Sequence, residues 1–169
     1  ATVAAAIGDV FADGFGEPEA TDETDKPKSP AEIAALQEAN LMAIIASKSG
    51  KSPTDVIEQA NEAHERMKRA YEASDSVKEE LLASKQPHEV ANAAHAAMLV
   101  ALKDGATMSS AEAAKAAAVA AVRAGARPSE AAVAAAAAAE VFDDLGEKRA
   151  AMAGLSAFTA VRNGYALPH

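Results

Sequence analysis

Small and apolar residues recur at helical spacing along most of the chain from about residue 30 onward, with polar residues between them. No stretch shows the strict alternation that a half-buried strand requires. The pattern predicts an all-α fold, an irregular array or bundle of about six to seven short antiparallel helices. The expected helices span about 30–48, 53–72, 76–84, 87–104, 109–124, 128–143 and 147–163.

A recurring phrase marks five of these helix starts: Pro or a small residue at the first helical position, with an acid two residues later. Pro has no N–H to leave unpaired there, a Ser cap accepts an N–H, and the acid complements the positive helix end. Ser76–Glu79 and Asp144–Glu147 are weaker candidates for further starts. The five clear examples are Ser29–Glu32, Ser52–Asp55, Gln86–Glu89, Ser109–Glu112 and Arg127–Glu130.

Helix ends are marked by glycines at Ser49-Gly50, Asp104-Gly105, Gly125 and Asn163-Gly164, where left-handed C-caps are expected. The connections between helices are therefore short, which makes consecutive helices antiparallel neighbours. The five copies of the start phrase follow one another at unequal intervals. Because no single period describes these intervals, we expect an irregular array rather than a regular solenoid.

The segment Ser109–Phe142 is predicted to be a helical hairpin. Ala, the best helix former, fills 18 of the 29 positions from 111 to 139, and a break with Gly125 and Pro128 separates the two arms. Small side chains let other helices approach closely, but each burial removes little apolar area from water. We therefore expect the hairpin to lie against something larger, either the rest of the chain or a partner.

The sequence divides into an N-terminal segment, residues 1–29, and an alanine-rich helical domain, residues 30–169. Apolar residues in 1–15 have the spacing of a short amphipathic helix, and 16–30 are polar, acidic and contain Pro. Residues 1–30 contain seven acidic and two basic side chains. This composition predicts either a solvated tether or an extended acidic arm along a basic partner surface.

Charge and composition exclude several classes of function. A net charge of −9 argues against nucleic acid as a partner, and no apolar run approaches the roughly 18 residues of a membrane span. There is no Cys, no HExxH motif and no EF-hand loop, and the Ser residues have roles as caps or packing residues. Adjacent acids such as Asp143 and Asp144 point to different sides of a helix, so we attribute them to solubility. We expect no catalytic residues and no metal site.

Two histidines, His64 and His95, each fall on an apolar helix stripe. One interpretation is a buried or interfacial imidazole that hydrogen-bonds a carbonyl or an acid. The other is axial ligation of a bound chlorophyll or other tetrapyrrole, for which a neutral imidazole on an apolar face is a suitable donor. His64 and His95 are therefore the candidate cofactor-binding residues.

These features predict a non-enzymatic helical scaffold or linker subunit of a larger protein assembly, whose partners are other protein subunits. The sequence begins with Ala rather than Met, for which the two explanations are removal of a targeting peptide and an incomplete sequence; we expect the first, with an organellar destination. A plastid location would make it an accessory subunit connecting pigment-binding proteins of a photosynthetic complex, peripheral to the membrane. The alternatives are a carrier of a hydrophobic ligand or tetrapyrrole and an amphipathic lipid or granule coat protein, and the alternative locations are secreted or cytoplasmic.

Overall fold

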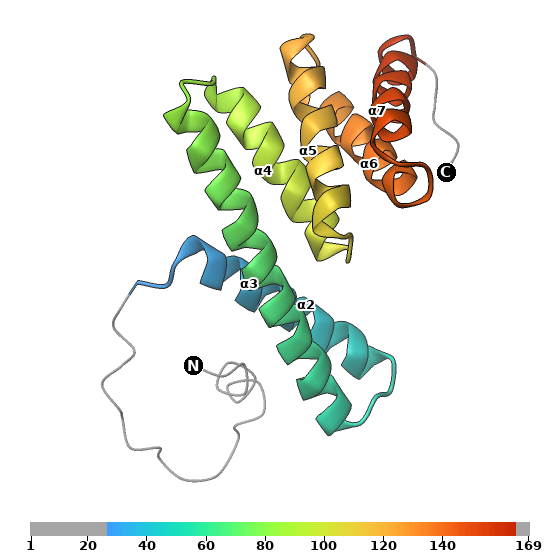
Figure 1. Ribbon diagram of the computed structural model, residues 1–169. Helices are drawn as coiled ribbons and strands as arrows, with labels where there is room; N and C mark the ends of the chain where they lie inside the picture. Colours follow the sequence, from blue (N-terminus) through green and yellow to red (C-terminus); the bar gives the residue numbers. More distant parts are fainter. Residues whose placement is uncertain (1–26, 165–169) are drawn as a thin grey trace. The chain divides into compact units, whose positions relative to one another are not determined.

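The computed structural model describes residues 27–164, and these residues contain helices and no strand. The all-α prediction is confirmed for this part of the chain (Figure 1). The amphipathic segment predicted at 1–15 and most of the acidic arm lie outside the described residues. The helices are α2 (Pro30–Lys48), α3 (Pro53–Ala83), α4 (His88–Lys103), α5 (Met108–Arg123), α6 (Pro128–Leu145) and α7 (Glu147–Arg162).

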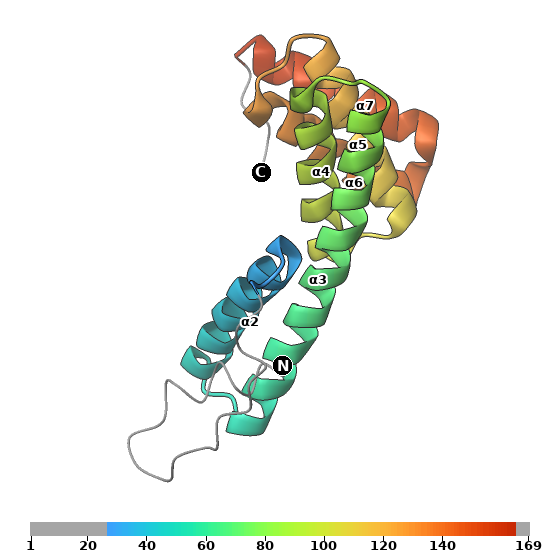
Figure 2. The ribbon, with the colours of Figure 1, turned by 90° about the vertical axis from the view of Figure 1, so that its left-hand side faces the viewer.

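The chain forms two compact units, Ala1–Arg69 (unit 1) and Ala70–His169 (unit 2), and the boundary falls inside α3. In unit 1, α2 packs on the first part of α3, where the fully buried Ala39 and Ala60 meet. Figure 2 shows α2 alongside that part of α3. The predicted division at residue 29/30 stays a prediction. No helix within residues 27–164 is both long and apolar enough to cross a membrane.

The break predicted between residues 72 and 76 is wrong, because α3 is continuous from Pro53 to Ala83. The segment contains neither Gly nor Pro, so its backbone can remain helical. The predicted start at Ser76 is not used. Nearby Ser74 is fully buried, and its Oγ donates to the carbonyl oxygen of Tyr71 (3.0 Å) in the same helix. A Ser whose hydroxyl donates to a carbonyl of its own helix can lie within that helix without terminating it.

Most predicted helix starts are confirmed, and two are shifted by one residue. The first of these is α4, which begins at His88 with Pro87 as its N-cap, whereas Pro87 was predicted to be the first helical residue. The Oγ of Ser29 accepts the Glu32 N–H, and the Oγ of Ser52 accepts the Asp55 N–H, both at 3.2 Å. The predicted cap at Ser109 is wrong, because α5 begins one residue earlier, at Met108. Its cap is Thr107, whose hydroxyl oxygen accepts the N–H of Ser110 (3.1 Å). Thr107 thus takes the capping role that was expected of Ser109.

Four connections share one backbone turn, in which a residue with positive φ follows the helix end. Three of these residues are the predicted glycines, and the fourth, Lys85 (φ 61°), is the one non-Gly residue with positive φ among the described residues. In each turn the next N–H donates to the carbonyl five residues earlier, the pattern of a Schellman motif. These bonds are Lys51 N to Ala46 O, Gln86 N to Leu81 O, Ala106 N to Ala101 O and Ala126 N to Ala121 O.

Unit 2 has a 20-residue period. The N-caps of α4, α5 and α6 are Pro87, Thr107 and Arg127, which are evenly spaced, and the buried positions repeat with them. The acidic start phrase does not reveal this period, because two of its copies lie in unit 1 and another falls at Ser109 rather than Thr107. Three series of buried residues follow this 20-residue spacing: Ala70, Val90, Ser110, Glu130 and Ala150; Ser74, Ala94, Ala114, Ala134 and Gly154; and Met98, Ala118, Ala138 and Phe158.

The helices of unit 2 pack in chain order (Figure 1). In addition, α4 contacts α6, and α5 contacts α7. The core is mostly Ala, with Met98 and Phe158 as its large buried side chains. The helices approach closely: a Cβ placed on Gly154 would lie 2.9 Å from the Cβ of Ala117. The close approach that small side chains were expected to allow is therefore present between the helices of unit 2.

Candidate functional site

A groove with a volume of about 940 Å³ lies between α4, α5 and α6 in unit 2. Buried Ala114 and Ala118 of α5 line it, together with Ser110, while the exposed Ala96 and Ala132 come from α4 and α6. The Oγ of Ser110 donates to the carbonyl oxygen of Ala139 (2.8 Å), so this hydroxyl links α5 to α6. We call this the larger groove.

Acidic side chains, and no basic ones, are found among the described residues that line the larger groove. Glu89 lies in the first turn of α4, and Asp104 follows the last residue of that helix. Glu140 and Asp143 lie near the end of α6, and an Asp143 carboxylate oxygen accepts the Thr107 hydroxyl (3.3 Å). The groove therefore combines an alanine-rich surface with four carboxylates.

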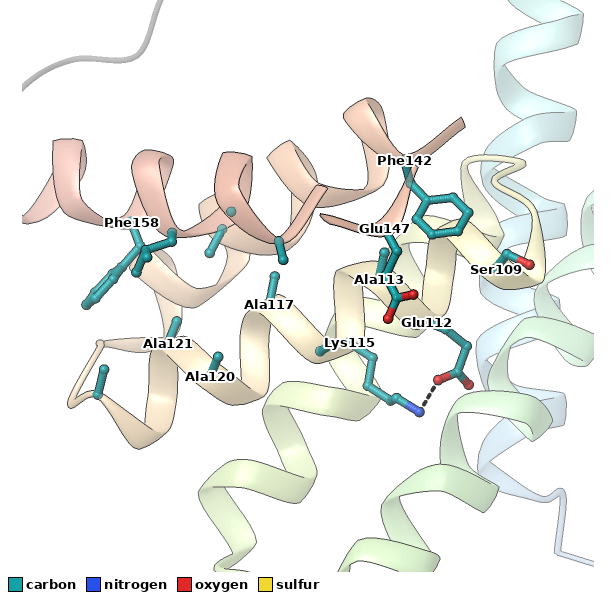
Figure 3. A pocket seen from close by; sticks show the side chains of 16 residues that line it. Ser109, Glu112, Ala113, Lys115, Ala117, Ala120, Ala121, Phe142, Glu147 and Phe158 are labelled. Carbon is teal, nitrogen blue, oxygen red and sulfur yellow. Dashed lines mark ion pairs between the residues drawn. The ribbon is translucent and has the colours of Figure 1, made fainter. Parts of the chain in front are cut away.

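The smaller groove, of about 490 Å³, lies between α5, α6 and α7. Figure 3 shows Phe142 and Phe158 toward opposite ends of a row of alanine side chains. Glu112 and Lys115, one turn apart on α5, form an ion pair beside the alanines (Figure 3). This groove thus contains both signs of charge.

The two grooves are related by the 20-residue period: twelve of the sixteen residues lining the smaller one lie 20 positions after a residue lining the larger one. Two changes between equivalent positions add volume in the smaller groove, Phe142 for Val122 and Leu155 for Ala135. The four carboxylates are not repeated, since their equivalents are Ser109, Ala124, Ala160 and Asn163.

Glu130 is a buried acid at the start of α6, and its contacts serve the helix rather than a ligand. One of its carboxylate oxygens accepts the Arg127 backbone N–H (2.8 Å), and the other accepts the Arg127 guanidinium (2.8 Å). The hydrogen bond from the Arg127 backbone, followed by that from its guanidinium, lowers the pKa of Glu130. This pair closes the first turn of α6.

His64 lies in unit 1 and is 5% exposed. Its Nε2 lies 3.3 Å from Glu32 Oε1 and its Nδ1 lies 3.5 Å from Glu65 Oε1. Glu32 also lies 3.7 Å from the Lys68 ammonium. Both ring nitrogens of His64 therefore face carboxylates, the geometry of a buried imidazole partnered by acids.

His95 belongs to unit 2 and packs edge-on against the Tyr71 ring, with 5.0 Å between centroids. Its Nδ1 is buried and has no hydrogen-bond partner within residues 27–164. Neither His95 nor His64 lines either groove, and the two belong to different units. Tetrapyrrole ligation by these residues stays a prediction. Of the two histidines, His95 is the one with a ring nitrogen, Nδ1, that has no hydrogen-bond partner within residues 27–164.

Within the described part of the chain, no group of three or more acidic or His side chains is placed to hold a metal ion. Comparison of the chain with protein-family models, with curated proteins and with solved structures found no match. Sequence reasoning missed both grooves, although the 20-residue alignment of alanines, such as Ala91, Ala111 and Ala131, was a signal that could have found them.

Proposed function

We propose that this protein is a non-enzymatic helical scaffold subunit that binds a helix of another protein in the larger groove of unit 2. The observation that carries the proposal is the lining of that groove, which is mostly Ala, with Val100 and Val122 as its largest apolar side chains. Small side chains on three neighbouring helices let the backbone of a fourth helix approach closely. Helix-in-groove binding is a common mode of protein recognition.

The groove supports contact rather than chemistry. Its one Ser among the described residues, Ser110, donates its hydroxyl to a backbone carbonyl, so this hydroxyl is not aligned with a base. Of its acids, Asp143 accepts the Thr107 hydroxyl and so links α6 to the start of α5, while Glu89 and Asp104 lie at the two ends of α4. These features support a binding role for the lining residues.

Among the alternatives, a carrier of a small hydrophobic ligand has a groove of suitable volume, since such sites measure roughly 300–1,000 Å³. Small-molecule sites are, however, usually lined by aromatic and large apolar side chains, and no aromatic residue of the described part of the chain lines the larger groove. This lining favours a helix as the ligand. The coat-protein alternative stays a prediction, which circular dichroism with and without lipid vesicles would test.

The first experiment is isolation of the protein from its source without denaturant, followed by measurement of its native mass. We expect a particle much larger than the 17.1 kDa chain. A chain that migrates alone would contradict the scaffold role. The visible spectrum of the same particle tests the plastid proposal, an accessory subunit between pigment-binding proteins, because that assembly would carry bound pigment.

A photo-crosslinking experiment tests whether the groove is the contact surface within that particle. Benzoylphenylalanine in place of Asn92, an exposed polar residue in the lining of the larger groove, should crosslink to another subunit. The same residue at Glu58, exposed on α3 in unit 1, is the matched control. Equal crosslinking at both positions would argue against a specific surface.

A further inference from the structure

We infer that the partner in the larger groove is a basic amphipathic helix of about 15 residues, with a small or apolar face and Lys or Arg at both ends. This inference rests on the proposed scaffold function and specifies its partner. Among the described residues, four carboxylates and no ammonium or guanidinium group line the groove, so its field favours a cationic ligand.

The positions of the acids define the length of the partner helix. Glu89 is the second residue of α4, and Asp104 directly follows the last residue of that helix. At a rise of about 1.5 Å per residue, these two positions are about 22 Å apart along the helix axis. A partner helix that aligns with α4 therefore needs about 15 residues between the basic groups that pair with Glu89 and Asp104.

The charge is stronger at one end of the groove. The hydrogen bonds from Ser110 to Ala139 and from Thr107 to Asp143 hold the start of α5 against the end of α6. The end of α4 precedes the start of α5, so Asp104 lies toward the same end as Asp143. At the other end, Arg123 donates to the Gln86 side chain (3.0 Å), which holds the end of α5 beside the start of α4. The partner should therefore have more basic residues at one end than at the other.

The sign of the charge also argues against two other occupants. The chain's own residues 1–30, with seven acidic and two basic side chains, have the wrong sign for an acidic groove. A second copy of the chain carries a net charge of −9, so long-range repulsion opposes its approach to the groove. Arg127, the basic residue between the lining residues Ala126 and Pro128, is already paired with Glu130. The negative charge of the groove therefore favours a basic partner of different sequence.

The test uses the full chain and two fluorescein-labelled helical peptides of about 18 residues, which is long enough to extend past both acids of α4. Both peptides have one Ala and Leu face; one carries Lys at its two ends, and the other carries Glu there. Binding is measured by fluorescence anisotropy. We expect the Lys peptide to bind at least about tenfold more tightly at low salt and to weaken as salt rises. Equal affinity for the two peptides would overturn the inference.

Two substitutions related by the 20-residue period separate the larger groove from the smaller one. Ala96 is exposed in the larger groove and Ala116 is exposed in the smaller one. We expect A96W to block the Lys peptide, with A116W binding as the original chain does. The far-ultraviolet circular dichroism of both variants checks that each is folded. Equal loss of binding in the two variants would place the site elsewhere.

Two charge variants, each removing four negative charges, distinguish specific pairing from attraction to an acidic protein. The groove variant should bind the Lys peptide about tenfold more weakly, and the control should bind within about twofold of the original. If both variants bind the Lys peptide equally weakly, binding depends on the net charge of the protein and not on the acids of the groove. The groove variant is Glu89→Gln, Asp104→Asn, Glu140→Gln and Asp143→Asn, and the control, at exposed positions, is Glu58→Gln, Glu62→Gln, Glu79→Gln and Glu80→Gln.

The outcomes also separate this inference from the proposed function. If the Lys peptide does not bind but the native protein travels in a larger particle, the basic-helix inference fails and the scaffold function stands. If the native protein travels alone, the scaffold function fails whatever the peptide does.

Discussion

Gly154 of α7 lies at a close approach between α7 and both α5 and α6, and replacing it with Ala tests whether this contact limits the fold. The added Cβ would lie 2.9 Å from Ala117 Cβ, 3.0 Å from the Ala134 carbonyl oxygen and 3.5 Å from Ala138 Cβ. Each of these atoms is backbone or directly attached to it, so none can move aside by a side-chain rotation. To accept the methyl group, α7 must move away from α5 and α6.

Two effects of opposite sign determine the result. Gly to Ala inside a helix normally stabilises by about 1 kcal/mol. Overpacking in a closely packed core costs about 1–3 kcal/mol. Because the new methyl group would contact two helices at 3.0 Å or less, we expect the upper part of this range, and a net destabilisation of about 1 kcal/mol. For a unit of 100 residues this lowers Tm by about 4–8 °C.

Thermal unfolding followed by circular dichroism measures this difference. Ser156→Ala, at an exposed position of the same helix, is the control for helix propensity and should change Tm little or raise it slightly. Adding Ala117→Gly to the Gly154→Ala chain removes the 2.9 Å contact, so the double variant should be more stable than the sum of the single effects predicts. A Gly154→Ala chain that melts higher than the original would refute the close-contact reasoning.

Three further substitutions test other parts of the structure. Phe158→Ala removes an aromatic ring from the core, where Phe158 is 5% exposed, and should lower the free energy of unfolding in urea titrations by about 3 kcal/mol. Leu155→Ala is the control: because Leu155 is 64% exposed, this substitution should change the free energy of unfolding by less than about 0.5 kcal/mol. Lys85→Gly should raise it by up to about 1 kcal/mol, because Lys85 has a left-handed φ of 61°; an unchanged urea midpoint would show that the turn is not strained. The Glu130 carboxyl has its pKa lowered in the folded state, so its contribution is complete above its ordinary value of 4.5 and is lost as pH falls below it. The stability difference between the original chain and Glu130→Gln should therefore shrink on acidification, and a difference that grows would contradict the assigned hydrogen bonds.

The helix ends could be predicted from sequence because they depend on local chemistry. Gly105 and Gly125 adopt the left-handed conformation after a helix end, and Ser29 accepts an orphan N–H, whatever packs around them. The absent break in α3 could not be predicted in this way. The segment from Ser74 to Ser76 has residues that can either cap a helix or bond within one, and the burial of Ser74 in unit 2 accompanies the second outcome.

The candidate site could not be predicted for a different reason. From sequence, Glu89 was interpreted as an acid that complements the positive end of its helix, and Asp143 as a residue that favours solubility. Each interpretation is reasonable when one helix is considered alone. Their presence in the lining of one groove depends on the packing of α4 against α6. The repeat period is present in the sequence, but Thr107 has to be recognised as a cap before the three helix starts align.

The two grooves show how one repeated backbone can offer two different surfaces. Ala97 and Ala114 line the larger groove, and their equivalents Ala117 and Ala134 line the smaller one, so the apolar contact offered to a ligand is similar in the two. Such contact contributes about 25 cal/mol per Å² without distinguishing one apolar helix from another. Selectivity must then come from the positions that differ: volume from Phe142 in place of Val122, and charge from Asp104, whose equivalent is neutral. Under the proposed scaffold function, a change of partner would therefore require substitutions only at the lining positions that differ, without altering the alanine core that holds the helices together.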